Sequence, residues 1–340
     1  MPGSIRIGVV GCGYWGPNHI RVFSTLGSLG AKMAAAADRS DDRRRHVAEL
    51  YPWVTVVTEA EAILRDPDLD AVVIATPART HYPFARMALE AGKHVLVEKP
   101  FVTEIEQAQE LIALARKRRL VLMAGHTFEY AAAVNRMREM LAESALGEIL
   151  YIRSERVNLG LFQTDINVIW DLAPHDVSIL LYVLGMMPTH VSAIGSAHVT
   201  EGVEDVAIVT LEFGPALMAN LLVSWLDPRK VRQMTLVGNR QMLVYDDLSS
   251  NEKLRLYDRG VDGPKHYDSF GEFHYSYRYG DIVTPMLKES EPLRAECSHF
   301  LECIARGATP RSSGEVGLKV TRVLSAAQHS LRNGQVRVPV

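Results

Sequence analysis

The chain has little of what would assign it to several special classes of protein. Only three cysteines occur among 340 residues, which argues against a disulfide framework and favours a reducing compartment. No apolar run approaches the roughly 20 residues that a membrane-spanning helix needs. No charged segment followed by an apolar stretch marks a signal peptide. We therefore expect a cytoplasmic protein with no membrane partner.

An excess of charge of one sign is also missing. The formal net charge is −3, so we expect no general polyanion-binding surface and no nucleic-acid partner. Apolar residues make up 47% and charged residues 23% of the chain, which is ordinary for a globular enzyme. A chain of 340 residues suggests about two domains.

The first part of the chain alternates strand-like with helix-like patterns. Five apolar runs are typical of short strands, at residues 5–10, 32–37, 71–75, 94–97 and 120–124. Such runs suit strands buried on both faces of a parallel sheet, and their alternation with helices indicates a doubly wound α/β fold. Thr103 and Glu106 have the spacing of a capping box before a helix over 105–115. We predict a dinucleotide-binding Rossmann domain over residues 1–125.

The pattern changes after residue 125. A helix is predicted near 133–142, and six strand-like runs follow at 149–157, 190–197, 205–213, 218–225, 232–237 and 241–245. Gly238 and Asn239 between the last two runs indicate a tight hairpin turn. Helices are predicted at 172–184, 293–306 and 316–332, and residues 260–292 resemble an irregular loop. We predict an α+β domain over 126–340, with a mainly antiparallel sheet, helices on one face, and roles in substrate binding and oligomerisation.

A glycine-rich turn follows the first predicted strand. Gly11, Gly13 and Gly16 fit G-x-G-x-x-G, in which the glycines permit a tight turn, close approach of a pyrophosphate, and helix packing. Asp38 lies 22 residues after Gly16, where a carboxylate can accept hydrogen bonds from the adenosine ribose. The three glycines alone could form an ordinary turn. The strand, helix and acid around them favour NAD, although Arg39 leaves a role in accepting a 2′-phosphate open.

A second motif, Glu98-Lys99-Pro100, closes the run at 94–97. It occurs in order with G-C-G-Y-W-G at 11–16, A-T-P-x-x-x-H at 75–81, a glycine at 125 and D-x-x-x-H at 171–175. With this set the sequence resembles the glucose–fructose oxidoreductase / inositol dehydrogenase family over essentially its whole length. The resemblance implies an NAD(P)-dependent oxidoreductase acting on CH–OH groups, with Lys99 as its catalytic lysine. Without the other motifs, Lys99 would be interpreted as an exposed lysine in a turn.

Asp171 and His175 are the other candidates for catalysis. They are four residues apart, so they can share one face of a helix. Pro174 is tolerated only in a first turn, which predicts a helix starting near Leu172 with Asp171 as its N-cap. Asp171 could be that cap alone, and His175 could be an ordinary buried histidine. The resemblance favours roles in substrate binding and proton transfer, and leaves open whether Lys99 or His175 takes the proton.

Further residues are expected around NAD. Thr76 and Pro77 follow a predicted strand at the edge where ligands bind in open sheets. His81 could lie near the ribose or on the surface, and Glu129 stands where the family often has an arginine. No metal ligand is expected. The full set expected to bind NAD is Gly11, Gly13, Tyr14, Trp15, Gly16, Asp38, Arg39, Thr76, Pro77, His81, Glu98, Lys99 and His126.

The substrate is expected to be a sugar. Segments 167–176 and 291–300 resemble family members acting on nucleotide sugars, which suggests oxidation at C3 of a UDP-N-acetylhexosamine. The residues expected to bind it are Lys99, Arg156, Asn167, Asp171 and His175. Inositol or aldose oxidation, ketoreduction in deoxysugar biosynthesis, an NAD-dependent glycosidase and a non-catalytic NAD-binding sensor are the alternatives. The family resemblance also implies a homodimer or homotetramer.

Overall fold

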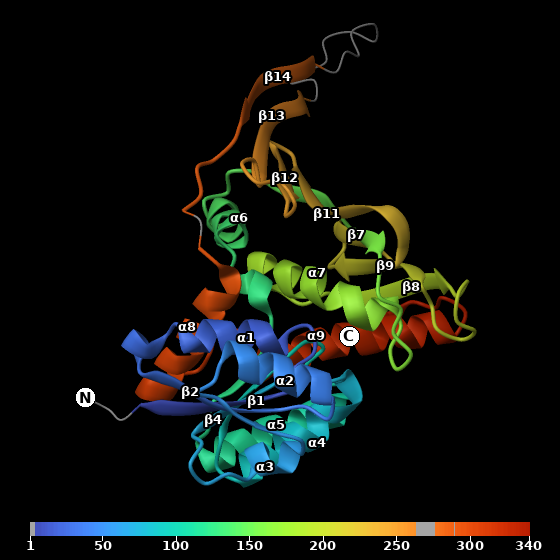
Figure 1. Cartoon of the computed structure of the whole chain (residues 1–340). Coiled ribbons are helices and arrows are strands. Elements are labelled where there is room, and N and C mark those ends of the chain that lie inside the picture. Colours follow the sequence, from blue (N-terminus) through green and yellow to red (C-terminus); the bar gives the residue numbers. More distant parts are fainter. Residues whose placement is uncertain (1–3, 263–275, 289) are drawn as a thin grey trace, which may run out of the picture. The chain divides into compact units, whose positions relative to one another are not determined.

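The computed structural model describes residues 4–262, 276–288 and 290–340, and they fall into two compact units (Figure 1). The first unit comprises Met1–Ala131 with Ser290–Ser325, and the second comprises Ala132–Glu289 with Ala326–Val340. The sequence suggested one division at residue 125. In the structure the chain instead returns to the first unit near its C-terminal end.

The first unit contains a six-stranded parallel sheet with strand order β3-β2-β1-β4-β5-β6. Its strands are β1 (Ile5–Val10), β2 (Ala31–Ala37), β3 (Thr55–Val57), β4 (Ala71–Ile74), β5 (His94–Val97) and β6 (Leu122–Ala124). The five predicted strands are confirmed. The short strand β3 was missed because three residues, none of them fully buried, give no detectable periodicity.

Helices cover both faces of this sheet, as a doubly wound fold requires. Alternate strand residues point to opposite sides, so Ile7 and Val9 join one hydrophobic cluster with α1 and α8, while Val10 and Ile74 join another with α4 and α5. The helices are α1 (Gly16–Ser24), α2 (Asp41–Leu50), α3 (Ala60–Leu64), α4 (His81–Glu90), α5 (Ile105–Arg118) and α8 (Pro292–Arg306).

Two helix predictions in this unit need correction. The N-cap of α5 is Glu104 and no side chain caps it, so the predicted capping box of Thr103 with Glu106 is not formed. The helix starts one residue later than that motif requires. Helix α8 was predicted to cover the second sheet, but it packs on α1 and the turn Thr127–Tyr130 of the first unit. Its buried face, which includes Phe300 and Leu301, completes the core on that side.

The second unit contains a nine-stranded sheet with strand order β14-β13-β12-β11-β7-β10-β9-β8-β15. Neighbouring strands are antiparallel except for β7 and β10, so the mainly antiparallel prediction is confirmed. The strands are β7 (Ile149–Leu159), β8 (His190–Ser196), β9 (Val206–Phe213), β10 (Leu217–Ser224), β11 (Leu226–Gly238), β12 (Met242–Asp246), β13 (Leu254–Asp262), β14 (Ser276–Val283) and β15 (Val338–Pro339).

The predicted loop over 260–292 is wrong at 260–262 and 276–283, which are strand, and is confirmed at 284–288 and 290–291, which form no helix or strand. Strands β13 and β14 pair there as an antiparallel ladder. Charged residues interrupt their alternation, so the period-2 signal of a strand is weak in the sequence. Residues 263–275 of that predicted loop lie outside the described residues.

Helix α7 (Val168–Leu184) packs along one face of the second sheet, against β7, β9 and β10 (Figure 1). Helix α6 (Ala132–Ala142) packs on α7, and α9 (Gly314–Arg332) begins in the first unit and ends in the second. Asn167 caps α7 by accepting a hydrogen bond from the Trp170 amide, so the predicted start at Leu172 and the predicted cap at Asp171 are wrong. Pro174 consequently lies inside the helix, where tertiary burial outweighs its local penalty.

Candidate active site

The glycine-rich turn between β1 and α1 has the conformation that its sequence requires. Gly11 has φ +92°, and a Cβ there would lie 2.4 Å from the Ala75 carbonyl oxygen. A Cβ at Gly16 would lie 1.8 Å from the Gly11 carbonyl oxygen, so this glycine is needed for close packing. At Gly13 the nearest atom would be 3.6 Å away, on the Arg43 guanidinium. A Cβ at Gly13 would therefore make only an ordinary van der Waals contact with an exposed side chain, which fits a turn whose backbone a pyrophosphate can approach.

Asp38 follows β2 and is joined to the same turn. One carboxylate oxygen accepts a hydrogen bond from the Cys12 amide at 2.7 Å, and the other accepts one from the Ser40 amide at 2.8 Å. Arg43 lies 3.6 Å from the first oxygen. A carboxylate has about four acceptor positions, so these contacts leave acceptor capacity for a ribose hydroxyl. Burial, followed by the charge of Asp38, raises the pKa of Cys12 to about 12, which suits a small filler rather than a nucleophile.

Glu98, Lys99 and Pro100 form the turn after β5. Glu98 is buried; Oε1 lies 2.8 Å from His19 Nε2, and Oε2 accepts a hydrogen bond from the Lys99 amide at 3.1 Å. Burial alone would raise the pKa of Glu98, but the hydrogen bond with His19, together with the charge of Lys99, holds that pKa below its ordinary value. The Lys99 side chain is half-buried. An ionised, rigidly held carboxylate therefore fixes the backbone of the predicted catalytic lysine.

His81 joins two turns at this edge of the sheet. The ring is buried, with Nδ1 2.7 Å from the Pro100 carbonyl oxygen and Nε2 2.8 Å from the Thr76 carbonyl oxygen. The sequence left His81 open between a ribose contact and a surface histidine. Burial excludes the surface interpretation, and the position near the ribose stays a prediction. Because both ring nitrogens contact the backbone, His81 ties the Thr76 turn to the Pro100 turn.

The segment after β6 carries His126 and the helical turn Thr127–Tyr130. His126 is buried, and burial lowers its pKa to about 4, so the ring is neutral near pH 7. Neither of its ring nitrogens has a hydrogen-bond partner within the part of the chain that the structure describes. Thr127 donates a hydrogen bond to Glu296 on α8 at 2.8 Å. Burial, and then the charges of Glu98 and Glu129, raise the pKa of Glu296 well above its ordinary value, which favours its protonated form.

In the second unit, Asp171 and His175 lie one turn apart on α7, and both are half-buried. Asp171 accepts a hydrogen bond from the Trp225 indole at 3.0 Å. Trp225 is fully buried at the junction of β10 and β11, and sequence reasoning missed it as a functional residue. Its position at the end of a predicted strand was visible, but its partner is 54 residues away. The shared helix face of Asp171 and His175 agrees with their spacing.

Two residues predicted to bind substrate have internal roles. The Arg156 guanidinium is buried and binds Asp176 on α7 through two hydrogen bonds of 2.8 and 3.0 Å. The Asn167 side chain caps α7 and donates to Glu204 and Gln328. A bidentate buried ion pair cannot release its arginine without leaving a buried charge unpaired. Arg156 and Asn167 therefore both have structural contacts within the second unit, and their roles in substrate binding stay predictions.

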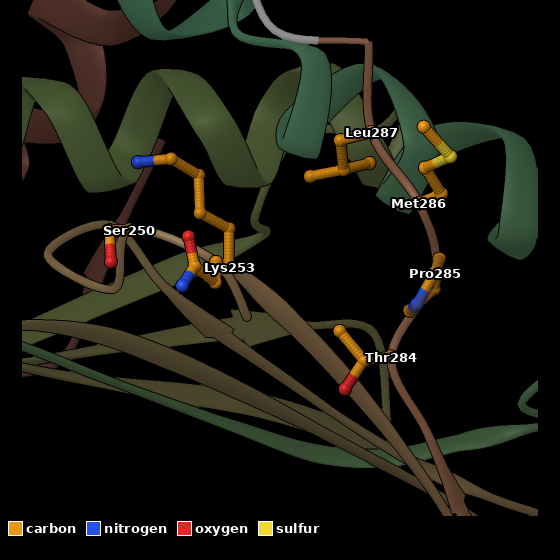
Figure 2. Close-up of a pocket in the computed structure, with 7 residues that line it drawn as sticks. Ser250, Lys253, Thr284, Pro285, Met286 and Leu287 are labelled. Atoms are coloured by element: carbon orange, nitrogen blue, oxygen red, sulfur yellow. The ribbon is translucent and has the colours of Figure 1, made fainter.

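A shallow pocket of the second unit lies elsewhere, between the β12–β13 turn and the segment after β14 (Figure 2). Its lining is Ser250, Asn251, Lys253, Thr284, Pro285, Met286 and Leu287. The Lys253 ammonium donates a hydrogen bond to the Asp247 carbonyl oxygen and so stabilises the β12–β13 turn. None of the predicted site residues lines this pocket. Across the described residues, no cluster of three metal-ligating side chains occurs, and no helix is long and apolar enough to cross a membrane.

Two family models match much of the chain. Residues 5–126 match a model described as "Oxidoreductase family, NAD-binding Rossmann fold", and residues 134–244 match one described as "GFO/IDH/MocA C-terminal domain". The first match contains the glycine-rich turn, Asp38 and Lys99. The second contains Asp171 and His175.

Two relatives of the chain are dehydrogenases. The UDP-N-acetylglucosamine 3-dehydrogenase of Acidithiobacillus ferrooxidans is 32% identical over 344 residues, which cover 99% of this chain and 97% of that enzyme. Its solved structure superposes with a TM-score of 0.78 at 28% identity, over 96% of this chain and 97% of that one. An inositol 2-dehydrogenase of Saccharopolyspora erythraea is 31% identical over 185 residues, or 54% of each chain.

Proposed function

The chain belongs to the Gfo/Idh/MocA family of oxidoreductases, and from that membership we propose that it oxidises a secondary ring hydroxyl of a sugar, with NAD as the hydride acceptor. The observation that carries the proposal is the Glu98-Lys99-Pro100 turn. A buried carboxylate there holds the backbone of a half-buried lysine in the NAD-binding Rossmann unit. Such a lysine can bond a hydroxyl oxygen and assist removal of its proton.

The residues of the first unit would hold the cofactor. The backbone at Gly13, which lacks a side chain, would let the pyrophosphate approach, and the remaining acceptor positions of Asp38 would bind the adenosine ribose. NAD, when bound, supplies the carbon that accepts the hydride. Neutral His126, whose ring nitrogens are unengaged by protein in the described chain, would donate one hydrogen bond toward the nicotinamide side of the site.

The proton of the hydroxyl group needs an acceptor as the hydride leaves. We assign its removal to Lys99 with His175, and Asp171 orients the substrate or the imidazole. The Trp225 indole holds Asp171 in place, so that the carboxylate keeps one orientation on α7. The two proton acceptors can act as a coupled pair, in which case the pH profile belongs to the pair rather than to either residue.

For the substrate we propose a UDP-N-acetylhexosamine oxidised at C3. Support comes from the full-length similarity of this chain to a UDP-N-acetylglucosamine 3-dehydrogenase. Since Arg156 is held in an internal ion pair, a diphosphate would have to be met by exposed cations such as Arg153 and Lys230. A free cyclitol is the second candidate, supported by the partial similarity to an inositol 2-dehydrogenase.

A substrate panel tests both candidates. The purified chain is mixed with NAD and, separately, with UDP-sugars, cyclitols and aldoses, and NADH absorbance is followed. We expect turnover with a UDP-N-acetylhexosamine, and a higher kcat/KM than with any cyclitol. Turnover with a cyclitol alone would replace the first candidate by the second. No NADH formation with any member would favour the non-catalytic sensor or the glycosidase and would overturn the proposal.

A further inference from the structure

His19 is a buried histidine that the proposed mechanism does not use. It lies in the first turn of α1, one turn beyond the glycine-rich segment, and its side chain is fully buried. Nε2 lies 2.8 Å from Glu98 Oε1, and Nδ1 lies 3.7 Å from the Cys297 thiol on α8. A single side chain thus connects helix α1, helix α8 and the turn that carries Lys99.

The two neighbours of His19, the Cys297 thiol and the Glu98 carboxylate, indicate which of its ring nitrogens accepts a hydrogen bond and which donates one. Burial, and then the charges of nearby acids, raises the pKa of Cys297 well above its ordinary value, so the group is a thiol and can donate to Nδ1. When Nδ1 accepts from the thiol, Nε2 is the ring nitrogen that can donate to Glu98. Glu98 can accept that bond with one oxygen and the Lys99 amide with the other. The Cys297 thiol, both ring nitrogens of His19, both carboxylate oxygens of Glu98 and the Lys99 amide each have a partner in this arrangement.

We propose that His19 is a positioning residue that acts through Glu98 to hold the Lys99 turn in the orientation needed for proton removal from the substrate. This inference rests on the proposed function of Lys99. Glu98 is buried among protein atoms, and an ionised carboxylate there needs a hydrogen-bond donor to stay ionised. His19 is the side chain that supplies that donor. Loss of the donor would let Glu98 take up a proton and loosen its hold on the Lys99 amide.

Other titratable groups also face Glu98 and set the background charge. Lys99 follows it directly and favours its ionised form, as does His19. The remaining neighbours with a resolved electrostatic interaction are His81 from α4, His126 after β6, and Glu296 and Cys297 from α8. Burial shifts the pKa of each of these four toward its uncharged form, which leaves the hydrogen bond with His19 and the charge of Lys99 as the contacts that favour ionised Glu98.

Two amide variants separate hydrogen bonding from packing. His19→Gln places an amide nitrogen at about the depth of Nε2, so donation to Glu98 is retained. His19→Asn places its amide at about the depth of Nδ1, too short to reach Glu98. Phe23→Leu is a packing control, because Phe23 stacks on His19 one turn further along α1 and does not contact Glu98. Circular dichroism and the melting temperature establish that each variant is folded.

The first readout is the pH dependence of turnover. We expect His19→Asn to lower kcat about tenfold or more at pH 7, with the KM for NAD changed less than about threefold. Its kcat should fall further as the pH is lowered, because Glu98 without its donor binds a proton at higher pH. His19→Gln should restore kcat and the profile to within about threefold, and Phe23→Leu should leave the profile unshifted. A merely structural role would lower kcat without moving the profile.

The second readout needs no cofactor. In the apo protein labelled with ¹³C at glutamate carboxyl carbons, the Glu98 resonance is assigned by its loss in Glu98→Gln. It should titrate at about one pH unit or more higher in His19→Asn than in the natural chain or in His19→Gln. Equal titration in all three, or unchanged kcat and profile in His19→Asn, would overturn the inference. If Lys99→Ala retains full turnover, the proposed function fails instead, whatever His19 does.

Discussion

Lys99 is the single residue on which the proposed chemistry most directly depends. Its amide is held by Glu98, and its side chain is half-buried in the NAD-binding unit. We predict that Lys99→Ala lowers kcat about 10²- to 10⁴-fold, the range expected for loss of a positioned proton acceptor. The dissociation constant for NAD, measured by fluorescence titration, should change little. A variant with natural kcat would show that the lysine is an ordinary turn residue.

Asp38 is the residue expected to set cofactor choice. Its carboxylate is held by the Cys12 and Ser40 amides, and a negative charge there repels a 2′-phosphate. We predict that Asp38→Asn lowers the ratio of kcat/KM for NAD over NADP by about tenfold, since one charge is removed while an acceptor remains. The exposed Arg43 would then be free to meet the phosphate. Steady-state kinetics with both cofactors tests this; an unchanged ratio would count against the ribose contact.

The start of helix α7 is stabilised by Asn167, a residue that was predicted to bind the substrate. Asn167 caps the helix and bonds Glu204 and Gln328. We predict that Asn167→Ala lowers the free energy of unfolding by about 1–2 kcal/mol, because a cap and two side-chain hydrogen bonds are lost. Urea unfolding measures this effect.

A matched cap provides the control for Asn167. Ser40 caps α2 through a longer contact of 3.5 Å to the Arg43 amide. Ser40→Ala should cost less, about 0.5–1 kcal/mol, and leave kcat within about twofold of the natural value. If Asn167→Ala is no less stable than Ser40→Ala, the side-chain network at the start of α7 contributes less than its geometry suggests.

For the whole molecule, the outer face of the second sheet bears on assembly. Ile194, Ile208 and Leu222 lie side by side in the strand register, on the face away from the buried residues of β9. Ile194 and Ile208 are 47% and 45% exposed. An apolar row on an exposed sheet face suits a self-complementary contact with a second copy of the chain. We propose this face as the contact of the homodimer or homotetramer that the family resemblance implies.

A charged substitution tests that proposal. Ile208→Lys should shift the mass measured by light scattering after gel filtration toward the 37.8 kDa of one chain. Met286→Lys is the control, because Met286 is 97% exposed in a different part of the second unit and should leave the mass unchanged. An Ile208→Lys variant that keeps the natural oligomeric mass would place the contact elsewhere.

Local pattern in the sequence was enough to determine the two architectures and the main motifs. Apolar runs identified five strands of the parallel sheet, and the glycine spacing identified the turn whose Gly11 and Gly16 cannot carry a side chain. These signals are local, because each depends on residues within one strand, turn or helix. The Asp171–His175 spacing is of the same kind, since one helical turn brings both to one face.

Only the tertiary structure decided which side chains meet across distant elements. Arg156 was predicted to bind substrate but pairs with Asp176, and His81 joins two backbone turns. His19 meets Glu98 across 79 residues, and α8 returns to the first unit, where Cys297 contacts His19. A buried polar group takes whichever partner packing brings to it. That partner is set by the three-dimensional path of the chain, which no local spacing encodes.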